Sequence, residues 1–113
     1  MQQSQEEIKK WLEEHKEQVL KITKVENGDL DLAAIKLKGV SFVQHRHTDD
    51  YLSTQALLLR GEGTVSTPHG RESLPGAAFE IALTDNWDGR RDGNSLHLKT
   101  ERASYTIEPA EGQ

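Results

Sequence analysis

Residues 19–37 read VLKITKVENGDLDLAAIKL, and this stretch decides the fold class. Apolar side chains alternate over residues 19–25, which is typical of a β-strand. Asn27-Gly28 follows, and this dipeptide is the strongest short signal for a two-residue hairpin turn because both residues tolerate a positive φ. Residues 30–37 then predict the returning strand, so the chain begins its sheet with a hairpin.

The apolar residues of the returning strand change phase. Leu30 and Leu32 fall on one phase of the alternation, whereas Ile35 and Leu37 fall on the other. An extra residue in one strand of a pair shifts the phase in this way. We therefore predict a β-bulge near residues 33–34.

Upstream of the hairpin, residues 4–18 predict a helix. Ser4 and Glu7 have the spacing of a capping box, in which each side chain binds a free backbone N–H of the other residue. Three- and four-residue steps place one apolar stripe along a single face. The stripe contains Ile8, Trp11, Leu12, His15 and Val19. We expect this helix to cover the sheet, with His15 at the boundary of the stripe and one of its ring nitrogens hydrogen-bonded.

Downstream of the hairpin, Gly39 predicts a turn, and short apolar segments separated by Gly-rich turns predict further strands. The expected strands are residues 40–46, 51–60 with an extended continuation through 64–67, 77–83, 95–100 and 103–108. Residues 51–60 could instead form a short helix, but the Gly-rich residues 61–63 that follow favour a strand. Within residues 77–83, we expect Ala77, Phe79, Ile81 and Leu83 to share one face. Residues 84–94, TDNWDGRRDGN, predict a loop with two Asp-Gly turns.

The fold class that follows is α+β, with an N-terminal helix and a mostly antiparallel β-sheet arranged as a barrel or sandwich. The 113 residues are the length of one domain. We expect the helix within residues 1–20, a β-rich body over 21–109 and a tail over 110–113.

Composition excludes several classes of function. Without cysteine, the chain has no disulfide, thiol nucleophile or Cys-type zinc site. The 14 basic residues are scattered among 19 acidic ones, for a net charge of −5, so we expect no binding to nucleic acid. No apolar run approaches the ~20 residues of a membrane span, and the polar N-terminus is unlike a secretory signal. We expect a cytoplasmic protein that does not enter membranes.

Residues 43–51, VQHRHTDDY, hold the first candidate site. His45 and His47 lie two residues apart, so on a strand both imidazoles point to one face and can bind one divalent metal. The candidates that would complete the site are Asp49, Asp50, His69 and His97. The alternative interpretation is a solvated strand end, at which both histidines titrate normally.

Two segments also resemble the cupins, which are small jelly-roll barrels. Residues 39–47, GVSFVQHRH, have the glycine, five residues and His-x-His of that family, and residues 56–81 follow its order of strand, Gly-x-Gly turn, strand, Leu-Pro-Gly turn and strand. The resemblance, over residues 39–83, implies a barrel that holds one divalent metal through the histidine pair, a Glu and a later His. Tyr51 and Leu52 stand where that Glu is expected.

The later histidine of the cupin pattern is expected near Asn86, where this chain has none, and His97 is the nearest one downstream. Two further candidates for ligand binding lie close by. Glu80 alternates with Phe79 and Ile81, so it faces either a barrel lumen, as a ligand-binding group, or solvent. Trp87 either lines a ligand site or caps the core.

Three hypotheses for function follow. The first is a barrel that binds a small ligand or a divalent metal. The second is a protein-interaction or regulatory module that acts through a sheet edge, the helix or a homodimer contact. The third, an isomerase or dioxygenase, ranks last because two good ligand candidates leave the open metal site of an enzyme incomplete; we identify no catalytic residue.

Overall fold

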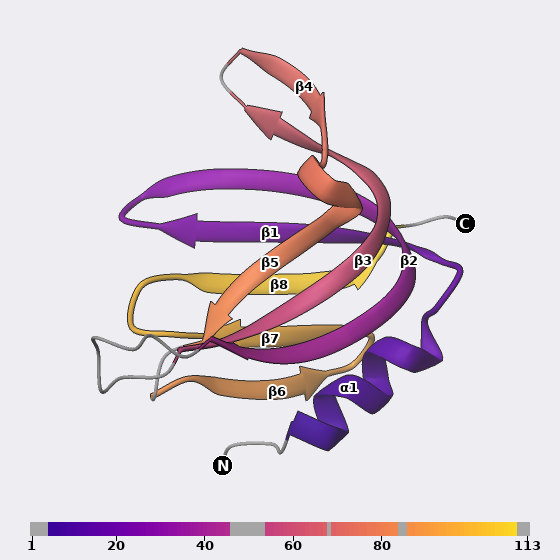
Figure 1. Ribbon diagram of the computed structural model, residues 1–113. Coiled ribbons are helices and arrows are strands. Elements are labelled where there is room, and N and C mark those ends of the chain that lie inside the picture. Colours follow the sequence, from indigo (N-terminus) through magenta and orange to yellow (C-terminus); the bar gives the residue numbers. More distant parts are fainter. Residues whose placement is uncertain (1–4, 46–53, 68, 84–85, 111–113) are drawn as a thin grey trace.

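The computed structural model describes residues 5–45, 54–67, 69–83 and 86–110. In this part of the chain, one helix precedes an antiparallel sheet of eight strands (Figure 1). The elements are α1 (Gln5–Glu14), β1 (Val19–Glu26), β2 (Asp29–His45), β3 (Thr54–Thr67), β4 (Gly70–Ser73), β5 (Ala78–Leu83), β6 (Asp88–Asp92), β7 (Ser95–Lys99) and β8 (Ser104–Pro109). A short 3₁₀ turn, Pro75–Ala77, leads into β5.

The strand order is β4-β3-β2-β1-β8-β7-β6, and β5 also pairs with β3. Residues 64–67 of β3 pair with β4, whereas residues 55–60 pair with β5. Figure 1 shows β1, β8, β7 and β6 in one layer, from which β2 and β3 curve round to place β5 in front of it. Across the described strands, β5 and β6 each have a single neighbour, so the sheet does not close on itself.

The curvature comes from bends in the two longest strands, β2 and β3. The register between them shifts between Leu37 and Gly39, as a β-bulge does. Across from the shift, a Cβ on Gly61 would overlap the carbonyl oxygen of Lys36, and one on Gly63 would overlap that of Ala34. Glycine therefore allows the two backbones to approach closely where the sheet folds over.

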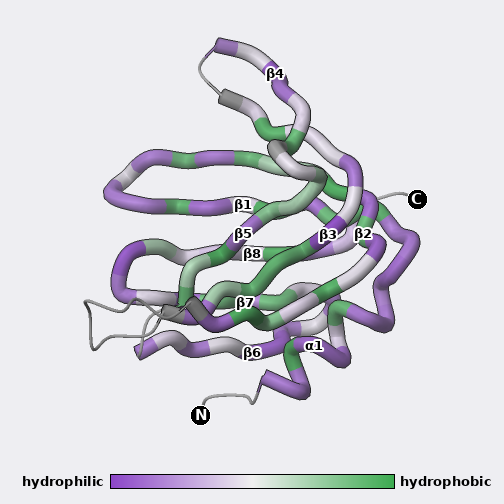
Figure 2. Tube along the Cα trace, in the orientation of Figure 1, coloured by the Kyte–Doolittle hydropathy of each residue, from purple (hydrophilic) through white to green (hydrophobic). Residues whose placement is uncertain are grey.

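The core fills part of the concave side of the bent sheet, where α1 lies. Ile8, Trp11 and Leu12 of α1 are each at most 1% exposed. Alternate strand residues meet them and are buried to the same degree: Leu20, Ile22, Ile35, Leu37, Leu57, Leu59, Ile81, Leu96, Leu98 and Ile107. Figure 2 shows the hydrophobic residues of α1 alternating with hydrophilic ones. Each such side chain is worth about 1.5–3 kcal/mol when buried, so the helix stripe contributes much of the stability.

The helix ends earlier than predicted, at Glu14 instead of residue 18. Glu17 adopts a positive φ of 70°, which stops the helix, and its N–H donates to the carbonyl of Leu37 at 2.8 Å. His15 is a boundary residue, as predicted: its Nδ1 lies 2.8 Å from the Trp11 carbonyl oxygen and its ring stacks on Trp11. Ser4 and its predicted cap lie outside the described residues.

The hairpin predicted at Asn27-Gly28 is confirmed. Both residues have positive φ, 52° and 83°, as the two-residue turn requires. The predicted bulge near residues 33–34 is wrong, because the β1–β2 register is continuous there. Leu30 and Leu32 instead face outward, with 61% and 37% of their surface exposed. The change of phase thus reflects apolar residues on the outer face.

Other predictions of secondary structure need correction. Residues 30–37 and the described part of the predicted strand 40–46, up to His45, form one strand, β2, because the register shift at Gly39 does not turn the chain. Residues 84–94 are not wholly a loop, since they contain β6, and β4 was not predicted. The sequences of β4 and β6, GRES and DGRRD, lack β-branched and aromatic residues. Pairing with a neighbouring strand, and not intrinsic β-propensity, therefore determines both strands.

Strand β5 keeps most of its predicted phase. Phe79, Ile81 and Leu83 face the core, whereas Ala77 lies in the turn before β5. The α+β class, with one N-terminal helix and a mostly antiparallel sheet, is therefore confirmed. Within the described ranges, no helix has the length and apolar character needed to cross a membrane.

Candidate functional site

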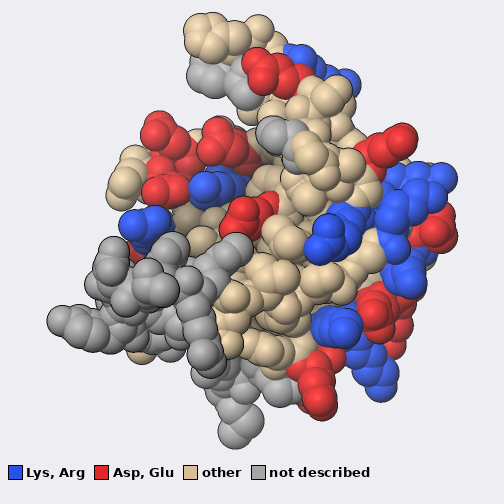
Figure 3. Space-filling view, in the orientation of Figure 1, with Lys and Arg blue, Asp and Glu red and all other residues tan. Residues whose placement is uncertain are grey.

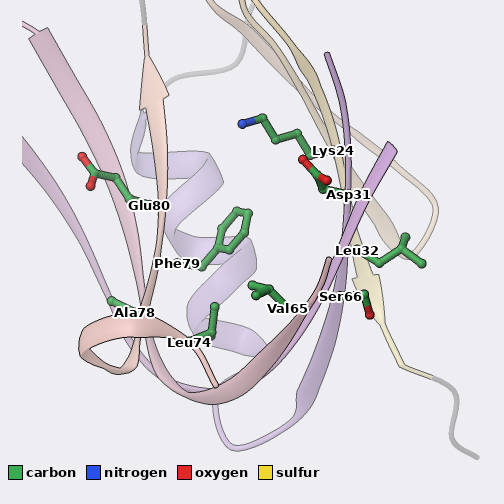
Figure 4. Close-up of a pocket in the computed structure, with 9 residues that line it drawn as sticks. All are labelled: Lys24, Asp31, Leu32, Val65, Ser66, Leu74, Ala78, Phe79 and Glu80. Atoms are coloured by element: carbon green, nitrogen blue, oxygen red, sulfur yellow. The ribbon is translucent and has the colours of Figure 1, made fainter. Parts of the chain in front are cut away.

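A cavity of about 490 Å³ opens between the β1–β2 hairpin and β5. Figure 4 shows Lys24 and Asp31 extending from the hairpin wall and Phe79 from the opposite wall. The remaining lining residues are Leu32, Val65, Ser66, Leu74, Ala78 and Glu80. Sites for small molecules commonly measure about 300–1,000 Å³ and are mainly apolar with a few polar groups, which is the character of this cavity.

Strand alternation places Lys24 at the cavity. Leu20 and Ile22 of β1 are buried on the concave side, and Lys24 is the next residue of the same phase. In the strand register, Lys24 lies opposite Asp31 of β2 on one side and opposite Tyr105 of β8 on the other. The inner face of β1 therefore changes from apolar to charged where the core gives way to the cavity.

The polar groups of the hairpin wall hold Lys24 in its charged form. Its Nζ lies 3.2 Å from Glu26 Oε1 and 5.8 Å from the centre of the Tyr105 ring. Burial disfavours the charge, but the hydrogen bond to Glu26 and the fields of Tyr105 and Asp31 outweigh it, so the pKa of Lys24 is raised. Burial also raises the pKa of the Tyr105 phenol, an effect that Lys24 opposes.

The opposite wall is apolar and is built by the turn before β5. The N–H of Leu74 donates to the carbonyl of Gly63 at 3.0 Å, which fixes this turn to β3. Leu74 is buried, and Phe79 and Val65 pack against the core as half-buried side chains. An apolar group in the cavity would meet these three side chains.

Negative charge exceeds positive charge around the cavity. The lining carries Asp31 and Glu80 against Lys24, and Glu26 and Asp29 follow at the end of the hairpin. Figure 3 shows acidic side chains gathered over the β1–β2 hairpin. Electrostatic complementarity therefore favours a ligand with a positive charge.

The predicted metal site falls largely outside the described residues. His47, Asp49 and Asp50 lie in the undescribed stretch, as does the side chain of His45, whose backbone ends β2 and pairs with Thr54. Among the residues that are described, no three His, Asp or Glu side chains form a group that could hold a metal ion. The prediction for His45 and His47 stays a prediction.

His97, proposed to complete that metal site, lies on β7. Its Nε2 is 3.7 Å from Asp92 Oδ2, and its Nδ1 is 3.4 Å from Thr106 Oγ1. His97 and Thr106 line a second recess of about 390 Å³, whose lining also includes Arg90 and Lys99 and is more polar than that of the first cavity. The exposed His97–Asp92 pair contributes little binding energy.

The two predicted ligand-binding residues have different environments. Glu80 is exposed and lies at the cavity, on the opposite phase of β5 from Phe79, and Figure 4 shows the two side chains pointing in different directions. Trp87 is half-buried against the core, and a Cβ on Gly89 would lie 3.2 Å from its ring and 2.6 Å from Ile8. Trp87 does not line the cavity, and its place matches the core cap.

Sequence reasoning missed Lys24 and Asp31. The available signal was the phase of Lys24, a charged residue that continues the buried positions Leu20 and Ile22. Asp31 could be found only through the hairpin register that sets it opposite Lys24.

Comparison with known proteins gives the family. The chain matches the family model described as YmzB-like protein over residues 1–111. It is 35% identical to "Uncharacterized protein YmzB" of Bacillus subtilis (strain 168) over 108 residues. This match covers 90% of this chain and 92% of that relative. No solved structure matches the chain significantly. The chain belongs to the YmzB-like family.

Proposed function

We propose that this protein binds a small ligand, with an apolar body and a positively charged head, in the cavity between the β1–β2 hairpin and β5. The observation that carries the proposal is the division of the cavity into two walls. Phe79, Val65 and Leu74 offer apolar contact, and the hairpin offers Asp31 beside a Lys24 that is already paired with Glu26. The role is binding without chemistry.

The test uses two probes with the same body and opposite charge, 4-phenylbutylamine and 4-phenylbutyric acid. Isothermal titration calorimetry should show binding of the amine, and weaker binding of the acid, because the excess charge at the cavity is negative. Binding of neither probe contradicts the proposal. Tighter binding of the acid contradicts the assignment of a cationic head.

Matched variants locate the binding. Asp31→Asn should lower the affinity for the amine by roughly tenfold, the scale of a charge-assisted contact of about 1.5 kcal/mol. Asp92→Asn, which changes an exposed carboxylate on β6, should leave the affinity for the amine unchanged. Equal loss in both variants would indicate a general electrostatic effect instead of a site.

The metal site and the jelly-roll topology of the cupins are separate predictions, supported by the sequence of residues 39–83. The first is tested by the divalent metal content of untagged protein, for wild type and a His45→Ala/His47→Ala double variant. Near-stoichiometric metal that disappears in the variant supports the site. Equal metal content in both proteins contradicts it.

A further inference from the structure

The free edge of β5 borders the same cavity. In the described part of the chain, β5 pairs with β3 alone, over residues 78–83. Its other edge carries backbone N–H and C=O groups that pair with none of the described strands, and such an edge is a template for pairing with another chain.

The composition of β5 leaves this edge unprotected. Natural sheets protect their edges with charged residues or proline. β6, with the sequence DGRRD, has four charged residues among five, and the edge strand β4, GRES, has two among four. β5, AFEIAL, has one charged residue and no proline. Figure 2 shows β5 as largely hydrophobic with one hydrophilic segment.

The cavity gives the edge a pocket for side chains. Ala78, Phe79 and Glu80 of β5 line it, and the hairpin forms its far wall. Side chains of a strand alternate between its two faces, so a strand added to β5 would point every second side chain into the cavity. Recognition by strand addition works in this way: main-chain hydrogen bonds supply affinity and pockets for alternate side chains supply specificity.

We infer that the group bound in this cavity is a side chain of an extended segment of another polypeptide, and that this segment pairs with the free edge of β5. An apolar side chain of the segment enters the cavity beside Phe79, and the basic side chains of its other face lie near the exposed Glu80, whose charge they complement. The inference rests on the proposed function, since it names the class of ligand for the same cavity.

The test uses the peptide acetyl-KVKFKVK-amide, whose apolar residues share one face and whose lysines share the other. Two methylated forms accompany it, one N-methylated at the Val and Phe residues and one at the Lys residues. In an extended chain, alternate N–H groups point to opposite edges, so each form blocks one edge.

Strand addition predicts that the parent peptide binds. One methylated form should bind about tenfold or more weakly, because it loses several main-chain hydrogen bonds, whereas the other form should keep the affinity of the parent peptide. Any other pattern overturns strand addition. If the amine probe binds and the parent peptide does not, the cavity proposal stands and this inference fails. If neither binds, both fail.

Protein variants identify the edge. Glu80→Lys reverses the exposed charge of β5 and should lower the affinity for the parent peptide by about threefold or more, the scale of an exposed ion pair. Asp92→Lys makes the same change on β6 and should have no effect. An equal effect of both variants contradicts binding at β5, as does a stable dimer of the free protein in which the β5 amides already resist hydrogen exchange.

Discussion

Two regions of one concave face differ in what fills them. Under α1, the face is packed with side chains at most 1% exposed, and Trp11, Ile8 and Leu12 close it. Between the hairpin and β5, the same face opens into a cavity with Lys24 and Phe79 on facing walls. Both regions have the same strand alternation, so the difference lies in what covers them and which residue types stand at inward positions.

The contrast separates stability from binding. Substitutions in the packed region leave a void or a clash that the surrounding core cannot relieve. Substitutions at the open region remove side chains that are partly in solvent, so they cost less in stability and change what the cavity can bind. The four predictions below test this division in order of expected effect.

The largest effect is expected in the packed region. Trp11→Ala removes an almost fully buried side chain and should lower the free energy of unfolding by about 3–5 kcal/mol. Chemical denaturation of the variant measures this change. Glu13→Ala, at an exposed position of the same helix, is the control and should change stability by about 0.5 kcal/mol or less. Similar losses in the two variants would contradict the packing of α1.

An added methyl group at the contact between α1 and β6 should have the next largest effect. A Cβ on Gly89 would lie 2.6 Å from Ile8 Cδ1 and 2.9 Å from Leu98 Cδ2, so Gly89→Ala should destabilise the protein by about 1–3 kcal/mol. Gly39→Ala is the matched control, since a Cβ there meets nothing within 4 Å. Thermal unfolding of both variants checks the difference; an unperturbed Gly89→Ala protein would place α1 elsewhere.

Phe79→Ala tests the open region. Because Phe79 is half-buried, its truncation should cost about 1–2 kcal/mol, less than the loss at Trp11, while binding of 4-phenylbutylamine weakens by roughly tenfold. Denaturation and calorimetry on the same preparation separate the two effects. A loss of stability as large as that of Trp11→Ala, with unchanged binding, would show that Phe79 belongs to the packed core.

The smallest effect concerns pH. The pKa values of Lys24 and Tyr105 are both raised in the folded chain, so above pH ~10 the unfolded chain binds fewer protons than the folded one. The free energy of unfolding should be unaffected by these groups below the ordinary pKa values and should fall as pH rises through the folded values. Urea unfolding between pH 8 and 11 measures the slope, which should be shallower in a Lys24→Met/Tyr105→Phe variant. An equal slope would contradict the raised pKa values of Lys24 and Tyr105.

Local patterns predicted the elements better than their connections. The helix stripe at Ile8, Trp11 and Leu12, the Asn27-Gly28 turn and the inward phase of β5 follow from spacing alone, whereas Val19, predicted in the stripe, is an exposed residue of β1. The continuity of β2 did not, because Gly39 has the same appearance in a sequence whether it bends a strand or ends it. β4 and β6 exist through pairing with distant strands, which no local signal reports.

The site was harder to predict for a related reason. Lys24 and Phe79 are 55 positions apart in the sequence, and only the curvature of β2 and β3 sets them across one cavity. The predicted motif at His45 and His47, by contrast, has a recognisable spacing within a few residues. Motif reasoning therefore favours local clusters over sites assembled by topology.

The most direct test of binding in the open region is the mapping of 4-phenylbutylamine on isotope-labelled protein by NMR. The amide signals of Asp31, Val65 and Phe79 should shift together and saturate with one affinity, while those of β6 and of Trp11 stay in place. Shifts that gather on β6 or under α1, or no saturable shift at the cavity, would contradict the assignment of the open region as the binding site.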